Sequence, residues 1–243
     1  MSGLNASSVL VAWEHARLQA PVQRALTLLC MAWPQRSIDE WAAISIGERD
    51  AALLTQHEQL FATAFENVAE CPRCAQTLEV AFRADDIRAE PPPAHEALTL
   101  CRDGYQIRFR LPNSGDLLAI MDADSGGHAA LLERCVHSAC RGSDSDSVSL
   151  EHLPEPVRQA LSEEMARADP QADVTIAMSC PACGHRFRMP FDILDYLWSE
   201  LEDWAQRALY EVHVLASAYG WYERDILEMS PQRRQIYLEM SGG

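Results

Sequence analysis

The sequence contains no lysine, so all 20 of its basic residues are arginines, against 36 acidic residues. The absence of lysine excludes Schiff-base chemistry and any phosphate-binding loop that needs a lysine. No glycine-rich phosphate loop and no nucleophile elbow is found either. The formal net charge of −16 argues against nucleic acid as the main partner, because phosphate binding requires a basic face. We therefore predict a protein that is not an enzyme and has no small-molecule substrate.

The sequence also lacks a secretory signal peptide and an apolar run long enough to cross a bilayer. Its eight cysteines, in a chain without a secretion signal, favour reduced metal ligands over disulfides. The chain has 243 residues, 48% of them hydrophobic, and can bury one large core or two small ones. We predict a cytoplasmic protein that does not bind membranes.

Four of the cysteines stand in two Cys-Pro-x-Cys motifs, at 71–74 and 180–183. Apolar residues follow each motif at alternate positions, which is the period of a half-buried strand. A C-x2-C turn directs two thiolates at one point, and two such turns complete the tetrahedron of a structural zinc. We predict one structural zinc ion in a split zinc ribbon, with four ligands: Cys71, Cys74, Cys180 and Cys183.

The long gap between the motifs leaves alternatives open. Each motif could belong to a separate site, with Cys101, Cys135 or Cys140 as further ligands and His137 beside them. A redox dithiol is another alternative, but such a motif usually stands at a helix N-terminus, whereas strands are expected after both motifs here. Four thiolates fill the coordination sphere of zinc, so a shared site leaves no position for a catalytic water.

Helix-capping patterns mark the first part of the chain. Ser37 precedes Glu40 and Ser45 precedes Glu48 at the spacing of a capping box. The second box opens a helix whose apolar residues recur at three-and-four spacing as far as Phe65. This part is expected to be entirely helical.

The middle of the chain is expected to contain the only strands. Residues 77–82 and 174–178 form the ribbon strands, and Asp103-Gly104 predicts a tight turn of a β-hairpin. A helix is predicted to follow, from about Gly127 to Cys140.

The C-terminal part reads as one long helix from 191 to about Tyr219, which Gly220 ends. A short helix follows at 223–229. Ser230-Pro231, an N-cap followed by proline at the first helical position, then starts another. We call residues 220–243 the hook, because these short helices can fold back onto the long one.

These patterns predict an α+β fold that is mainly α. It comprises a helical body, a split zinc ribbon with duplicated knuckles, a small β-hairpin, and a long C-terminal helix followed by a short helical hook. The expected regions are an N-terminal helical region, 1–70, the split ribbon with inserted hairpin and helices, 71–190, and the long helix with the hook, 191–243.

The C-terminal part of the chain resembles the C-terminal segment of the proteins of a known family. The residues that carry the resemblance are Tyr-Gly-Trp-Tyr-Glu-Arg-Asp-Ile-Leu at 219–227 and Ser-Pro-Gln-Arg-Arg at 230–234. The members of this family are zinc-ribbon-containing baseplate or tail assembly proteins of contractile phages and phage-derived contractile injection systems. Cys-Pro-x-Cys-Gly at 180–184 is similar too, whereas the first motif departs from the pattern with Ala75. The resemblance implies a structural or assembly role, with other baseplate or tail proteins as partners and a phage-like particle as the place of incorporation.

Arg233 and Arg234 form a basic pair beside Tyr237. They either satisfy helix-end carbonyls or pair with Glu223 and Asp225, or they form a docking patch for a partner protein. We predict the docking patch, made of Tyr219, Trp221, Arg233, Arg234 and Tyr237. The alternative function is a zinc-ribbon adaptor that binds nucleic acid or a transcription complex.

Overall fold

The computed structural model describes residues 5–61, 63–90, 97–121, 127–141 and 148–242. The chain divides into two compact units. Met1–Arg36 and Ile193–Gly243 form the helical unit, and Ser37–Asp192 form the central unit. The N-terminal region expected at 1–70 therefore contributes helices to both units.

The helical unit is built on the long helix, which confirms the predicted C-terminal stripe. Its apolar residues recur every three or four positions and are buried, among them Leu197, Leu201 and Leu215. The guanidinium of Arg24 lies 3.9 Å from the ring centroid of Trp198, a cation–π contact between two helices. The helices of this unit are α1 (Ala6–Ala16), α2 (Pro21–Ala32), α9 (Ile193–Tyr219), α10 (Glu223–Leu227) and α11 (Pro231–Met240).

The predicted signals at the end of α9 are confirmed. Gly220 has φ +68°, a left-handed conformation that favours glycine. The Ser230 hydroxyl accepts a hydrogen bond from the backbone N–H of Arg233, and Pro231 begins α11. Both α10 and α11 pack against α9, so the hook folds back as expected.

Both capping boxes of the central unit are confirmed, since Ser37 and Ser45 cap α3 (Ile38–Ala43) and α4 (Ile46–Leu60). The predicted continuation of the second helix to Phe65 is wrong. Phe65 lies in strand β1 (Ala64–Glu70), where its ring stacks on that of Phe82 at 5.2 Å between centroids. This segment forms a strand because it pairs with the next strand, although its apolar residues have the spacing of a helix.

Each Cys-Pro-x-Cys motif joins the two strands of an antiparallel hairpin. The first hairpin is β1 and β2 (Thr77–Arg83), followed by α5 (Ala84–Ile87), and the second hairpin is β6 (Thr175–Ser179) and β7 (Arg186–Pro190). The predicted ribbon strands are thereby confirmed.

A third sheet has three strands, β3 (Leu98–Arg102), β4 (Tyr105–Phe109) and β5 (Val136–Arg141), in that order. The turn between β3 and β4 is the predicted one, with positive φ at Asp103 and Gly104. The predicted helix to Cys140 is wrong in its second half. Helix α7 (Gly127–Cys135) ends where β5 begins, because β5 pairs with β4 and buries Ala139 opposite Ile107.

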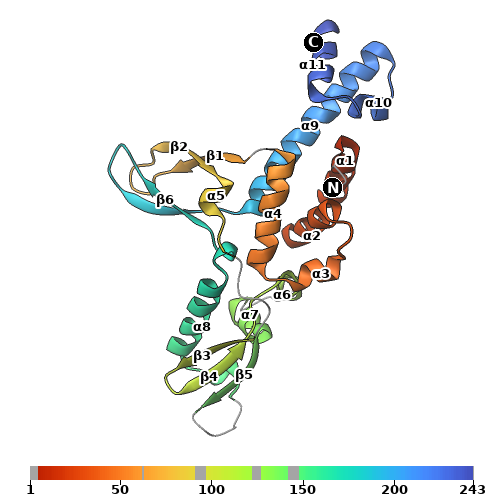
Figure 1. The fold of residues 1–243 in the computed structure, drawn as a ribbon. Helices are drawn as coiled ribbons and strands as arrows, with labels where there is room; N and C mark the ends of the chain where they lie inside the picture. Colours follow the sequence, from red (N-terminus) through yellow and green to blue (C-terminus); the bar gives the residue numbers. More distant parts are fainter. Residues whose placement is uncertain (1–4, 62, 91–96, 122–126, 142–147, 243) are drawn as a thin grey trace. The chain divides into compact units, whose positions relative to one another are not determined.

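One face of this sheet packs against two helices and forms a hydrophobic core with them. Ile107 and Phe109 are fully buried against Leu132 of α7 and against Val157 and Leu161 of α8 (Glu155–Ala168). Figure 1 shows α8 running along the sheet. The remaining elements of the unit are α6 (Ser114–Ile120), η1 (Leu150–His152) and η2 (Pro170–Ala172).

The fold is α+β and mainly helical, as predicted, with small sheets and a long C-terminal helix. None of the helices that the structure describes is both long and apolar enough to cross a bilayer.

Candidate metal centre and docking surface

The two cysteine motifs adopt the same local structure. The N–H of Ala75 donates to the carbonyl of Cys71, and that of Gly184 to the carbonyl of Cys180, each at 2.9 Å. Ala75 and Gly184 both have positive φ, 55° and 68°. Alanine therefore adopts at this position the left-handed conformation that glycine takes more readily, and the first knuckle keeps the geometry of the second.

The four thiols of the motifs converge on one point. Cys71 Sγ lies 3.7 Å from Cys183 Sγ, and Cys74 Sγ lies 3.6 Å from Cys180 Sγ. All four sulfurs lie within 4.8 Å of one another, and none is in a disulfide. A Zn–S distance of about 2.3 Å places the sulfurs of a tetrahedron about 3.8 Å apart. The arrangement therefore fits a metal ion held by four thiolates from both motifs.

The thiols of the first knuckle influence each other's ionisation. Burial opposes ionisation of Cys71, but hydrogen bonds from the backbone of Arg73 and Cys74 lower its pKa to about 7. The backbone of Gln76 favours the thiolate of Cys74, but contacts with Cys183, burial and the other thiols raise its pKa to about 12. One thiolate forms readily and hinders the next. A cation is what would allow all four to ionise together.

The hairpins pack on each other around the thiols. Leu78, Met178 and Phe187 lie against the cysteines in one small apolar cluster. Phe82 and Phe191, each the eleventh residue after the first cysteine of its motif, contact edge to face at 5.1 Å between ring centroids. The two halves therefore meet through equivalent residues.

The other cysteines do not come together. Cys101 and Cys140 lie on β3 and β5, on either side of Gln106 in the central strand. Cys135 is buried at the end of α7, with its sulfur 3.9 Å from a carboxylate oxygen of Asp116. Within the described ranges, Cys71, Cys74, Cys180 and Cys183 form the one group of three or more side chains close enough to hold a metal ion.

Comparison with protein families gives one decisive finding. The family model described as "T4 bacteriophage base plate protein" matches residues 34–198, more than half of the chain. The chain belongs to this family. The matched segment includes the whole central unit and both cysteine motifs. No curated protein and no solved structure gives a significant match to this chain.

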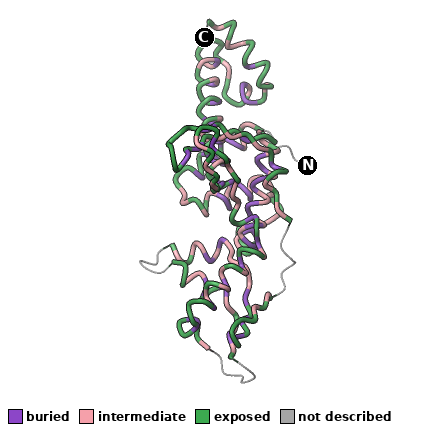
Figure 2. The backbone as a smooth tube through the Cα atoms, turned by 90° about the vertical axis from the view of Figure 1, so that its left-hand side faces the viewer, coloured by how far each residue is buried: buried purple, intermediate pink, exposed green. Residues whose placement is uncertain are grey.

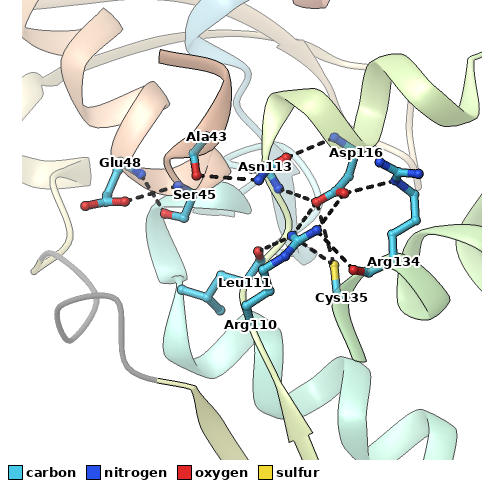
Figure 3. A network of polar contacts seen from close by, with 9 residues as sticks. All are labelled: Ala43, Ser45, Glu48, Arg110, Leu111, Asn113, Asp116, Arg134 and Cys135. Atoms are coloured by element: carbon cyan, nitrogen blue, oxygen red, sulfur yellow. Dashed lines mark hydrogen bonds and ion pairs between the residues drawn. The ribbon is translucent and has the colours of Figure 1, made fainter. Parts of the chain in front are cut away.

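A buried polar network in the central unit has no clear signature in the sequence (Figure 3). Its centre is Asp116, whose side chain is 1% exposed and accepts hydrogen bonds from Arg110, Arg134 and the backbone N–H of Asn113. Burial raises the pKa of Asp116, but these donors outweigh it and hold the pKa below its usual value. Burial and the nearby Asp116 carboxylate raise the pKa of Cys135 to about 11. The network connects the residue that follows β4 to α6 and α7.

Three aromatic residues of the predicted docking patch pack against each other. The rings of Tyr219 and Trp221 stack at 4.6 Å between centroids, and Tyr237 meets Trp221 edge to face at 4.8 Å. The Tyr219 hydroxyl donates to the carbonyl of Tyr237 at 3.3 Å. Arg233 is exposed and lies 5.8 Å from the Tyr237 ring centroid. These contacts hold the start of the hook against α11, which is largely exposed (Figure 2).

Arg234 lies apart from its exposed neighbour. It is 5% exposed, and its Nε donates to a carboxylate oxygen of Glu211 at 2.7 Å. Its Nη1 donates to the carbonyl of Met229 at 2.8 Å. Arg234 therefore pairs with α9 and not with Glu223 or Asp225, the acidic residues considered from the sequence.

Proposed function

We propose that this protein is a non-catalytic structural or assembly component of a phage-like contractile tail or contractile injection system. The family match over residues 34–198 carries the proposal. The protein would be made in the cytoplasm and enter a phage-like particle. Its partners would be other baseplate or tail proteins.

The proposed metal is one structural zinc ion bound by Cys71, Cys74, Cys180 and Cys183. The convergence of the four sulfurs supports this assignment. Zinc bound by four thiolates has no open position for water or substrate, so its contribution is to stability. It would hold together two hairpins that are far apart in the sequence and bury little apolar surface by themselves.

The proposed docking surface for partners is on the hook and the last residue of α9. Tyr219, Trp221 and Tyr237 form a rigid aromatic cluster, and aromatic residues and arginine are the types enriched at protein interfaces. Arg233 is accessible beside this cluster, whereas Arg234 would support the surface by fixing α11 to α9. This surface lies outside the segment that the family model matches.

Elemental analysis of purified protein tests the metal assignment. We expect one zinc per chain in the wild type and none in Cys71→Ser, with Cys101→Ser as the control that keeps its zinc. Cys180→Ser should also lose the metal and lower the melting temperature of the whole chain, because structural zinc contributes folding free energy directly. Two zinc ions in the wild type, or a Cys180→Ser variant that keeps its metal and its melting temperature, would refute the shared site.

Co-purification with the other tail proteins of the same system tests the assembly role. A Trp221→Ala variant should keep its zinc and lose the partner, if the hook carries the contact. Binding of DNA or RNA at low salt, without any tail partner, would instead favour the zinc-ribbon adaptor.

A further inference from the structure

The two hairpins share one backbone design but carry opposite charges. Alternation along each strand directs one set of side chains toward the cysteine cluster and the other set outward. Leu78 and Phe187 belong to the inward sets, which meet at the thiols. The two outward faces therefore point away from each other within one chain.

The outward face of the second hairpin is basic. Arg186 and Arg188 are both exposed on β7, and their cross-strand partners Ser179 and Ala177 are too small to cover them. Arg188 donates to the hydroxyl of Thr175 at 2.9 Å. Residues 175–190 contain no acidic side chain, in a protein whose net charge is −16.

The outward face of the first hairpin carries three glutamates, Glu66, Glu70 and Glu79, and one arginine, Arg83, at the end away from the cysteine motif. Glu70 on β1 and Glu79 on β2 are exposed, and Val68, the cross-strand partner of Glu79, is 63% exposed. In the part of the chain that the structure describes, the four side chains Glu70, Glu79, Arg186 and Arg188 form no ion pair.

The spacing of the two glutamates on the first hairpin matches the spacing of the two arginines on the second hairpin. Arg186 and Arg188 are two residues apart on one strand, a separation of about 7 Å. Glu70 and Glu79 are diagonal neighbours across the first hairpin, because Glu70 pairs with Thr77, and such neighbours are about 7–8 Å apart. A pair of carboxylates thus matches a pair of guanidiniums.

We propose that the acidic face of the first hairpin docks onto the basic face of the second hairpin in another copy of this chain. The occupant is a second copy because both complementary faces are present on every molecule and point in different directions. Such a head-to-tail contact uses two different surfaces, so it leads to a ring if the rotation closes and to a filament if it does not. This proposal is independent of the hook and goes beyond the assembly role proposed above.

The net charge decides the conditions under which the contact forms. Copies of a chain with charge −16 repel each other at low ionic strength. At about 0.15 M salt the Debye length is about 8 Å, so distant charges are screened while carboxylates and guanidiniums in direct contact still attract. We expect self-association to be strongest near this salt concentration and to weaken at about 1 M, where contact pairs are screened too.

Sedimentation velocity of the full-length, zinc-loaded protein over a range of concentrations tests the proposal. Variant A carries Arg186→Glu with Arg188→Glu, and variant B carries Glu70→Arg with Glu79→Arg. Each variant should self-associate about tenfold more weakly than the wild type, because the attraction between the two faces becomes repulsion. A mixture of A and B should associate again, because the acidic first face of A meets the native basic face of B. The control for A, Arg102→Glu with Arg167→Glu, makes the same charge change at exposed sites elsewhere.

Zinc content and circular dichroism, measured on every variant, separate this result from loss of the fold. The proposal is overturned if the wild type stays monomeric at all salt concentrations. It is also overturned if A and the control behave alike, or if mixing A with B restores nothing. Loss of nucleic-acid binding in A, with no change in self-association, would assign the basic face to nucleic acid and likewise overturn it.

Discussion

The backbone N–H of Gly47 donates a hydrogen bond to Oδ2 of Asp169, 122 positions further along the chain, at 2.9 Å. Gly47 is in the first turn of α4, and Asp169 is 2% exposed between α8 and η2. Burial raises the pKa of Asp169, and the Gly47 bond opposes this by favouring the carboxylate. The contact joins the start of α4 to η2, and it requires a residue without a side chain at position 47.

Gly47→Ala should therefore destabilise the central unit. A Cβ at this position would lie 1.9 Å from Oδ1 of Asp169, so the buried carboxylate must move away. We expect the free energy of unfolding to fall by about 3 kcal/mol, measured by chemical denaturation. Gly127→Ala is the control, because an added Cβ there meets no atom within 4 Å. Equal stability of the two variants would contradict this account.

Asp116→Asn should destabilise the network of Figure 3 by about 2 to 3 kcal/mol, since Arg110 and Arg134 lose their buried counter-charge. Because the pKa of Asp116 is lowered in the folded state, its stabilising effect is present above the unfolded pKa near 3.9 and is lost as the pH falls through the folded pKa. Acid unfolding followed by circular dichroism should show a smaller loss of stability in the variant. Asp203→Asn, at an exposed position of α9, should behave as the wild type.

The contribution of Asp50 to stability should depend on pH in the opposite direction to that of Asp116. Burial raises the pKa of Asp50 to about 6, although Arg49 lies 2.7 Å away and lowers it, and Asp192 and Asp169 raise it further. Between the unfolded pKa near 3.9 and about 6, the folded state binds more protons than the unfolded state. The contribution of Asp50 to the free energy of unfolding therefore decreases as the pH rises through this range, by up to about 3 kcal/mol.

Denaturant unfolding of Asp50→Asn between pH 4 and pH 7 measures this contribution. The variant should lose the part of the pH dependence that comes from Asp50, whereas Asp203→Asn should keep it. An unchanged slope in Asp50→Asn would show that this carboxyl group titrates normally.

Arg234→Ala should release α11 from the long helix. The substitution removes the hydrogen bonds to Glu211 and to the carbonyl of Met229, a local cost of about 2 kcal/mol. Hydrogen exchange should show faster exchange of the amides of 232–240, with those of the central unit unchanged. Arg233→Ala, which removes an exposed side chain of the same type, should leave exchange as in the wild type. Similar exchange in both variants would mean that Arg234 does not anchor α11.

Local signals in the sequence were sufficient for many elements. The capping boxes at Ser37 and Ser45, the tight turn at Asp103-Gly104 and the glycine after α9 were all predicted correctly. Each depends on backbone groups within a few residues of the signal, so no distant contact is needed to specify it. The two Cys-Pro-x-Cys knuckles are local in the same sense.

Strands β1 and β5 were not predicted, because the partner strand decided both. Phe65 continues the apolar spacing of a helix, and Val136 to Cys140 follow a helical segment without a break. Their register with Phe82 and Ile107 places them in sheets instead. The network around Asp116 escaped prediction for a related reason, since a single aspartate becomes its centre only when Arg110 and Arg134 are brought to it by other elements.

The sequence by itself determined the residue types of this protein's chemistry: four paired cysteines, no lysine, and helices with capped ends. Only the tertiary structure decided that both cysteine pairs meet within 4.8 Å, that Arg234 is buried while Arg233 is exposed, and that the equivalent hairpin faces differ in charge. The physical reason is the separation, along the chain, of the groups that interact. Turns and caps are fixed by hydrogen bonds between near neighbours, whereas convergence and burial depend on packing between segments that the chain brings together only on folding.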